Sequence, residues 1–399
     1  MTTARFMTVD EALSALFDLV RPLPSETVPL TQAAGRVLAQ DVTATRPQPP
    51  FAASAMDGYA VAGDVASGDT LRVIGEAAAG HGFLGSVAPQ EAVRIFTGAP
   101  VPTGATRVII QEDVTRDGDL ITLGDSLDAG LYIRPAGGDF NIGDAVPAPR
   151  LLRPADLALL ASMNCAHVPV TRKPTIALIA TGDELVMPGE APHEDQIIAS
   201  NTFGLKAMFE TAGAAVRMLP IAKDTESSLG LALDLAQGAD LIVTIGGASV
   251  GDHDIVGKVA ANRGLERSFY KVAMRPGKPL MAGRIGSSTL VGLPGNPVSS
   301  MVCGDIFILP MLHKMLGLGA APRARVRAAL ARALPKNGPR EHYMRARFDP
   351  LTGDVSAFDR QDSSLLTVLS EANALIVRPA HDRERAVGEA VDYIVLHSA

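Results

Sequence analysis

Short apolar runs alternate with helical patterns from Thr175 to about Leu316. The runs at 175–180, 215–221, 239–245 and 288–292 are rich in β-branched residues, which is typical of buried strands. Apolar residues recur at helical spacing in the segments between or after them, at 201–210, 226–237 and 297–316. Strands and helices in alternation predict an α/β domain built on a doubly wound parallel sheet.

The rest of the chain follows other patterns. Apolar spacing after Thr8 predicts an N-terminal helix that begins with a capping box formed by Thr8 and Glu11. From residue 46 to 146 there are short strand-like runs and turns without helix-length periodicity, which predicts a β-rich module. Residues 152–163 predict a short helix, and the segment after Pro322 predicts a small β domain.

The buried strand that ends at Ile245 leads into a loop, Gly246–Asp254, that contains glycine, hydroxyl and carboxylate residues. Gly246 and Gly247 let backbone N–H groups approach an anion, because no Cβ blocks the way. Ser249 adds a hydroxyl, while Asp252 and Asp254 add carboxylates able to hold a hard cation that bridges phosphate oxygens. The alternative interpretation is a tight strand-to-helix turn with solvated aspartates.

Three of the predicted parallel strands end in polar loops. The loops are Thr181–Glu184, Gly246–Asp254 and Pro294–Ser300. Because ligands in open α/β sheets bind at the carboxyl ends of strands, we expect the loops to gather at one edge and form a site.

Two cations stand three residues apart in a rigid loop, Met274-Arg275-Pro276-Gly277-Lys278-Pro279. Arg275 and Lys278 are typical of either a solvated turn or an oxyanion receptor. The net charge of −7 argues against general nucleic-acid binding and means that an anionic substrate needs such a local cluster. We therefore favour the oxyanion receptor.

The β-rich module carries acids in glycine-containing turns. Asp57 precedes Gly58, and Asp139 follows Gly137-Gly138. Asp-Gly is an ordinary turn pair, so the local sequence alone favours a structural role for Asp57. For Asp139, the local sequence does not decide between a turn acid and a site acid.

Composition and the N-terminal sequence indicate where in the cell the protein works. Hydrophobic residues make up 47% of the 399-residue chain, enough for folded cores, and the two cysteines lie far apart in apolar contexts. The N-terminus lacks a secretory pattern, and no apolar run has the length of a membrane span. We expect a cytoplasmic protein that binds neither membranes nor nucleic acid. The histidines show no zinc spacing.

Six motifs, in order along most of the chain, resemble the molybdopterin molybdenumtransferase family, which includes bacterial MoeA and the C-terminal domain of gephyrin. They are SAMDGYA (54–60), FTGAPVP (96–102), TGDEL (181–185), GGASVGDHD (246–254), MRPGKP (274–279) and LPGNP (293–297). Each match is weak alone, but six in sequence are specific.

The resemblance implies four domains in an elongated homodimer. They are a molybdopterin-binding α/β domain (1–27 and 171–319), a linking domain (28–45 and 147–170), an inserted β-rich domain (46–146) and a C-terminal β-barrel-like domain (320–399). The implied site lies between subunits. The other implied partners are a molybdopterin adenylyltransferase and proteins that accept the cofactor.

The implied reaction inserts molybdate into adenylylated molybdopterin with Mg²⁺ and releases AMP. Cleavage of a pyrophosphate linkage needs neutralisation of developing charge, which fits carboxylates that hold Mg²⁺. The resemblance assigns metal binding and hydrolysis to four acids, Asp57, Asp139, Glu184 and Asp254, with Glu184 and Asp254 as the metal ligands. It assigns substrate binding to Gly246, Gly247, Ser249, Asp252, Thr97, Arg275, Lys278, Arg345 and Ser363.

Within that set, Ser249, Asp252 and the paired glycines would hold the pterin phosphate region. Arg275, Lys278, Arg345 and Ser363 would receive molybdate. Arg275 stands where many relatives carry Lys, which changes the geometry offered to an oxyanion. The last domain matches least clearly.

Two other functions stay open at this point. Molybdopterin adenylyltransferases share the GG-x-S-x-G-x-x-D strand end but are small single domains that would not need SAMDGYA or TGDEL. A non-catalytic pterin-binding scaffold is the second alternative, because the same fold also serves as a binding module. The retained acids and cations favour the enzyme, while molybdate and tungstate are too similar for the sequence to separate.

Overall fold

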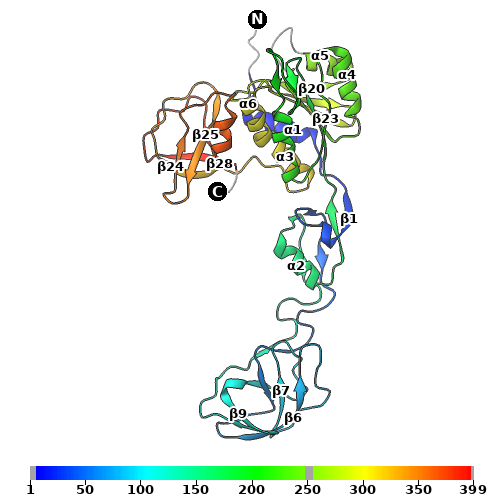
Figure 1. The fold of residues 1–399 in the computed structure, drawn as a ribbon, viewed down its shortest axis with the longest axis vertical. Helices are drawn as coiled ribbons and strands as arrows, with labels where there is room; N and C mark the ends of the chain where they lie inside the picture. Colours follow the sequence, from blue (N-terminus) through cyan, green and yellow to red (C-terminus); the bar gives the residue numbers. More distant parts are fainter. Residues whose placement is uncertain (1–5, 248–254, 397–399) are drawn as a thin grey trace.

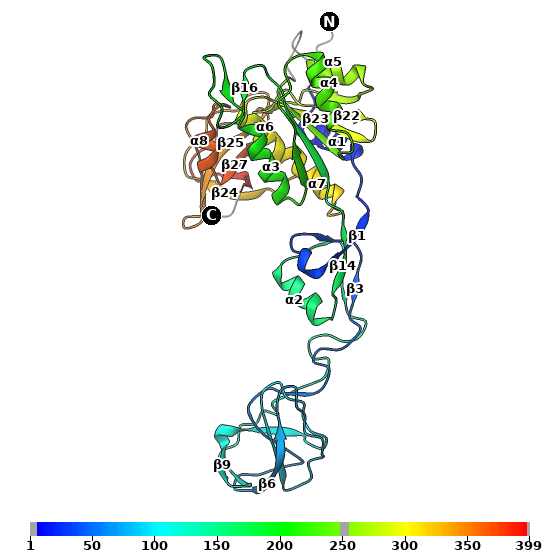
Figure 2. The same cartoon turned by 45° about the vertical axis from the view of Figure 1, so that its right-hand side comes forward.

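The computed structural model describes residues 6–247 and 255–396. The molecule is elongated, with the α/β domain and the C-terminal barrel at one end and the inserted β domain at the other (Figure 1). A small linking domain lies between the two ends, as both views show (Figure 2).

The α/β domain contains a six-stranded sheet in the order β18-β15-β19-β23-β22-β20. The strands are β15 (Thr175–Ala180), β18 (Ala215–Met218), β19 (Leu241–Ile245), β20 (Glu266–Tyr270), β22 (Met281–Ile285) and β23 (Ser288–Leu293). The first four strands in the order are parallel, as predicted, whereas β22 runs antiparallel to both of its neighbours, β23 and the edge strand β20. The sheet is therefore mixed, not wholly parallel.

Helices cover both faces of this sheet. Alternate residues of β15 pack into two separate cores: Ile176 and Leu178 face one, whereas Ala177 and Ile179 face the other. The first core includes residues of α1 (Val9–Leu19), α3 (Asn201–Thr211), α6 (Pro297–Cys303) and α7 (Leu309–Met315). The second includes residues of α4 (Glu226–Leu235) and α5 (Ile255–Asn262). The predicted doubly wound architecture is confirmed.

Two details of the helices follow from the sequence. Thr8 and Glu11 form the predicted capping box at the start of α1. A π-helical segment, Gly304–Ile308, joins α6 to α7, so one helical run extends over Pro297–Met315. This run is long and apolar enough to cross a membrane, but 83% of it is buried inside the protein, as in the core helix of a folded domain.

The linking domain is crossed twice by the chain. Its four-stranded sheet, β1-β14-β2-β13, combines strands from both passes: β1 (Ser25–Pro29), β2 (Val37–Leu38), β13 (Arg150–Leu151) and β14 (His167–Thr171). Helix α2 (Pro154–Ser162) packs with them around Leu160 and Val170. Next to the inserted domain, β3 (Val42–Thr43) pairs antiparallel with β12 (Ala145–Val146).

The inserted domain is β-rich, as predicted. Its main sheet has the order β8-β5-β7-β6-β10-β9. The strands are β5 (Gly58–Val61), β6 (Thr70–Ala77), β7 (Glu91–Ile95), β8 (Arg107–Ile110), β9 (Val114–Asp117) and β10 (Leu120–Leu123). A second pair consists of β4 (Ala53–Ser54) and β11 (Ile133–Arg134). A hairpin turn that contains Gly118 joins β9 to β10.

The C-terminal domain is a closed five-stranded barrel. Its strands are β24 (Val326–Leu330), β25 (Glu341–Asp349), β26 (Asp354–Ala357), β27 (Ala374–Arg378) and β28 (Ala390–Val395), and pairing of β25 with β27 completes the closure. Helix α8 (Leu366–Glu371) contacts α6, and β21 (Met274–Arg275) of the α/β domain pairs with β25. The barrel is thus joined to the α/β domain.

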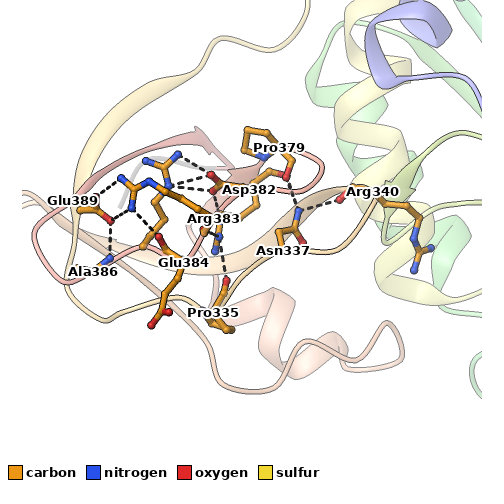
Figure 3. Close-up of polar contacts among 11 residues, drawn as sticks. Pro335, Asn337, Arg340, Pro379, Asp382, Arg383, Glu384, Ala386 and Glu389 are labelled. Carbon is orange, nitrogen blue, oxygen red and sulfur yellow. Dashed lines mark hydrogen bonds and ion pairs between the residues drawn. The ribbon is translucent and has the colours of Figure 1, made fainter.

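Buried charge stabilises one end of the barrel. The guanidinium Nε of Arg378 donates to Asp382 at 2.6 Å, and Arg385 donates to the same carboxylate. Nearby, the side-chain amide of Asn337 donates to the carbonyls of Arg340 and Pro379 (Figure 3). These hydrogen bonds hold the loops around Asn337 and Asp382 in place, and Arg378 between them is only 2% exposed.

Candidate functional site

A cavity of about 450 Å³ lies at the carboxyl ends of the parallel strands. All three polar loops expected at this edge contribute to its wall: Thr181 to Glu184 after β15, Gly246-Gly247 after β19, and Pro294 to Pro297 after β23. A small two-stranded ribbon, β16 (Leu185–Val186) paired with β17 (Ile197–Ile198), forms another wall. The predicted convergence of the loops is confirmed.

The paired glycines are required by their backbone and by their surroundings. Gly246 and Gly247 have φ values of +88° and +63°, in the left-handed region that favours glycine. A Cβ on Gly247 would lie 2.5 Å from a methyl group of Val256 and 2.7 Å from the hydroxyl oxygen of Thr181. The chain therefore passes close to β15 without side chains in the way. Ser249, Asp252 and Asp254 lie outside the described residues.

Carboxylates reach the cavity from two strand ends. Glu184 lies in the loop after β15 with its side chain exposed at the cavity. Its carboxyl group folds back over Gly182, where a Cβ would come within 2.5 Å of it. Asp224, beyond the end of β18, also lines the cavity. Within residues 6–247 and 255–396, no cluster of three or more His, Cys, Asp or Glu side chains is arranged to hold a metal.

Cations also line the cavity. Lys278 and Lys271 both line it, and the ammonium of Lys278 lies 5.1 Å from the centre of the Phe6 ring. Gly277 has a φ of +106° and packs against buried Cys303. Arg275 is exposed on β21 and pairs in register with His342 of β25, so it faces the barrel side of this loop.

The barrel brings a second group of predicted residues to this region. The hydroxyl of Ser363 accepts a hydrogen bond from the side-chain amide of Asn296 (3.0 Å), a residue that lines the cavity. Asn296 is the N-cap residue of α6, but its side chain makes this interdomain bond instead of capping the helix. The backbone N–H of Val298 also donates to the carbonyl of Ser363.

Arg345 is fully buried, which the sequence did not indicate. Its Nη2 donates to the carbonyls of Arg360 and Asp362, while its Nε and Nη1 have no partner within the described part of the chain. Burial lowers the pKa of Arg345, and the nearby charge of Arg275 lowers it further. Burial also lowers the pKa of His342 to about 4, helped by the charges of Arg275 and Arg345. A neutral histidine therefore lies among several cations.

Asp57 and Thr97 are hydrogen-bonded to each other in the inserted domain. The backbone N–H and the hydroxyl of Thr97 donate to one carboxylate oxygen of Asp57 at 2.7 and 2.8 Å. These bonds, the backbone bond first, hold the pKa of Asp57 below its ordinary value. Arg94 lies nearby, over the rings of Tyr59 and Phe96.

The predicted site residues do not all meet within one chain. Asp57 and Thr97 belong to the inserted domain, which lies at the opposite end of the molecule from the α/β domain with Glu184 and the cavity (Figure 1). Exposed Asp139 precedes Phe140, which packs in the core of the linking domain. A single subunit therefore contains two separate groups of predicted residues.

Sequence reasoning missed three residues that line the cavity. Asp224 follows a parallel strand, so the rule applied to the other strand ends would have found it. Lys271 precedes the Arg275–Lys278 loop in a left-handed conformation (φ +73°) that is uncommon for a residue other than glycine. Asn201 begins α3, and its amide donates to the carbonyl of Gly295. Its position on the cavity depends on tertiary packing.

Comparison with known proteins gives three consecutive matches. Residues 7–164 match the family model "MoeA N-terminal region (domain I and II)", residues 177–314 the "Probable molybdopterin binding domain" and residues 327–396 the "MoeA C-terminal region (domain IV)". The three matched segments together cover most of the chain, and the last of them, residues 327–396, coincides with the C-terminal barrel.

Relatives of similar length support the same grouping. Molybdopterin molybdenumtransferase 2 of Mycobacterium tuberculosis is 36% identical over 395 residues, covering 95% of this chain and 97% of the relative. Molybdopterin molybdenumtransferase of a Nostoc species is 33% identical over 408 residues, covering 97% and 93%. The crystal structure of the molybdopterin biosynthesis MoeA protein from Pyrococcus horikoshii superposes with a TM-score of 0.83 at 27% identity, covering 98% of this chain and 100% of that one. The chain therefore belongs to the molybdopterin molybdenumtransferase (MoeA) family.

Proposed function

We propose that this protein inserts molybdate into adenylylated molybdopterin and releases AMP in a Mg²⁺-dependent step. The observation that carries the proposal is the cavity at the strand ends. It places the carboxylate of Glu184 and the ammonium groups of Lys271 and Lys278 around one space. A substrate with a pyrophosphate group needs both kinds of charge: cations to receive its oxygens, and an acid to hold a metal that bridges them.

The residues at the cavity fit a magnesium ion. Mg²⁺ commonly binds through one or two protein carboxylates together with waters and substrate phosphates, so a preformed cluster of three acids is not needed. Glu184 and Asp224 supply carboxylates, and Asp254 follows in the sequence outside the described residues. When bound, the ion would neutralise charge that develops as the pyrophosphate linkage breaks.

Molybdate would be received where the α/β domain meets the barrel. The cations there are Lys278, Arg275 and buried Arg345, and Ser363 is held beside the cavity by Asn296. Nε and Nη1 of Arg345, which have no partner among residues 6–247 and 255–396, support the proposal, because unpaired N–H groups of a buried guanidinium are costly and a tetrahedral oxyanion supplies acceptors.

The separation of the two residue groups supports a shared site in a homodimer. Asp57 is kept ionised by Thr97 but lies far from the cavity of its own chain. Asp57, Thr97 and Asp139 would act at the cavity of a partner subunit in a C2 dimer in which each inserted domain packs against the other chain. We further propose that the enzyme works in the cytoplasm, receives its substrate from a molybdopterin adenylyltransferase and passes the product to cofactor-accepting proteins.

The test is reconstitution at low molybdate. Purified protein is mixed with adenylylated molybdopterin and Mg²⁺, and both AMP release and activation of an apo-molybdoenzyme are followed. We expect molybdate-dependent AMP release together with activation, and loss of both in Glu184→Gln. AMP release without activation would contradict the proposal in favour of a hydrolase. Pterin binding without either signal would favour a scaffold. In a parallel assay with ATP and molybdopterin, consumption of ATP would favour an adenylyltransferase.

A further inference from the structure

Thr181 carries a hydroxyl for which the described residues offer no partner. The residue is 4% exposed, and its Oγ1 makes no hydrogen bond within residues 6–247 and 255–396. Buried hydroxyl groups are nearly always hydrogen-bonded, because leaving one without a partner destabilises the fold. A buried hydroxyl at a cavity that has no partner among the described residues is available to a bound ligand.

The backbone holds Thr181 at the base of the cavity. Its N–H donates to the carbonyl of Ile245 at 2.9 Å, which ties the end of β15 to the end of β19. Its side chain lies against the paired glycines: a Cβ on Gly246 would come within 3.2 Å of Oγ1, and one on Gly247 within 2.7 Å. The hydroxyl is thus fixed against two residues that have no side chain of their own.

The surroundings of Thr181 identify the kind of group it would bind. Lys271 and Lys278 line the same cavity and make it receptive to anions. Glycine backbone at a strand end allows close approach of a phosphate, and a threonine hydroxyl can donate one hydrogen bond to a phosphate oxygen. A hydroxyl directed at such an oxygen gains its missing partner without displacing any bond within the protein.

We infer that the Thr181 hydroxyl donates a hydrogen bond to a phosphate oxygen of the pyrophosphate linkage in the bound substrate. Thr181 is then a substrate-binding residue that fixes the phosphate against Gly246 and Gly247. The inference rests on the proposed function, since it names a contact of that same substrate.

A second threonine provides a matched control. Thr244, on β19, is fully buried, and its Oγ1 also has no partner within the described ranges. Thr244 is not part of the described lining of the cavity; its hydroxyl lies near Gly292 of β23 instead. The two positions share burial and an unpaired hydroxyl and differ in contact with the cavity.

The experiment compares Thr181→Val with Thr244→Val in the full-length protein, using adenylylated molybdopterin and Mg²⁺ without molybdate. Both variants should raise the unfolding temperature of the free protein by roughly 2 °C, because valine removes an unpaired buried hydroxyl at nearly constant shape. Only Thr181→Val should weaken substrate binding, by about tenfold, since it alone loses a hydrogen bond to a charged oxygen. Thr181→Ser keeps the hydroxyl and should bind like the wild type.

Equal substrate affinity in Thr181→Val and the wild type would overturn the inference, as would a loss of affinity in Thr181→Ser equal to that in Thr181→Val. If Thr181→Val does not fold, Thr181→Ser and Thr181→Ala give the same comparison, because they differ from each other by the hydroxyl alone. Failure of the wild type to bind would instead overturn the proposed function, and this contact with it.

Discussion

Asn296 and Ser363 join two domains through one hydrogen bond. The side-chain amide of Asn296, at the start of α6, donates to the hydroxyl of Ser363 in the C-terminal domain at 3.0 Å. Asn296 faces the cavity, so the bond places the barrel residue beside the proposed molybdate region. The backbone bond from Val298 to Ser363 is independent of either side chain.

Breaking this side-chain bond should weaken molybdate use without separating the domains. We expect Asn296→Ala and Ser363→Ala each to raise the molybdate concentration needed for half-maximal AMP release, with coupling of about 1 kcal/mol between them. A double-mutant cycle on that concentration measures the coupling, and circular dichroism checks the fold. Strict additivity of the two effects would show that the bond has no role in the reaction.

Mixing two inactive variants should restore activity if the site is shared. We expect Asp57→Asn and Glu184→Gln each to abolish cofactor formation, because each removes a carboxylate from every site. After subunit exchange, about a quarter of wild-type activity should return, because mixed dimers contain one site in which both acids are intact.

The control for the mixing experiment uses two changes on the same side of the site. Glu184→Gln mixed with Lys278→Ala should remain inactive, because both residues line the cavity of one chain. Recovery there, or its absence in the first mixture despite demonstrated exchange, would contradict the shared site.

Thr97 should set the acid limit of the reaction. Its hydrogen bonds hold the pKa of Asp57 below the ordinary value, so the carboxylate stays ionised at lower pH. Thr97→Val removes the hydroxyl but keeps the backbone N–H, so the pKa of Asp57 should rise part of the way back. The acid limb of the pH–rate profile should then move to higher pH, and carbon-13 NMR of Asp57 should show the same shift. An unmoved profile together with a raised Asp57 pKa would mean that Asp57 does not act as a base or metal ligand in the rate-limiting step.

His342 should make stability depend on pH. It is buried among Arg275, Arg345, Arg378 and Arg340, and its pKa in the folded protein is about 4, below the ordinary 6.5. Between these values the unfolded chain binds a proton that the folded chain does not, so the free energy of unfolding decreases as the pH falls. The loss should reach about 3 kcal/mol at most, at 1.36 kcal/mol for each pKa unit.

Urea unfolding at about pH 7 and about pH 5 would measure this loss in the wild type and in His342→Gln, in which no imidazole titrates. The free energy of unfolding of the wild type, measured relative to that of His342→Gln, should be lower at about pH 5 than at about pH 7. A constant difference would mean that the pKa of His342 is not lowered by folding.

The sequence predicted the centre of the α/β domain better than its edge. Continuous β-branched runs such as Leu241–Ile245 are long enough and apolar enough to indicate strands buried on both faces. The antiparallel pair β20 and β22 was missed, because Glu266–Tyr270 is largely exposed and carries charge, which is typical of an edge. Edge strands owe their conformation to the neighbour with which they pair.

The candidate site was predictable to the extent that it depends on strand ends. Glu184 and Gly246 follow parallel strands, and topology alone brings such residues together. The burial of Arg345 and the bond between Asn296 and Ser363 depend on closure of the barrel and its packing on α6. No local pattern encodes those contacts. The separation of Asp57 from Glu184 likewise follows from a β domain inserted into another domain.

The pairing of β3 with β12 has a consequence for the modularity of the protein. Because Thr43 lies beside Ala145, residues 46–146 leave and re-enter the rest of the molecule at a single point. The inserted domain is therefore a separable unit in topology, although the sequences of the other domains continue on both sides of it. A short turn in its place would leave a chain that keeps the cavity and the barrel but lacks Asp57 and Thr97. Removal of this one segment would thus separate Asp57 and Thr97 from the residues that line the cavity. In a mixed dimer, an intact chain could supply the inserted domain that the shortened chain lacks.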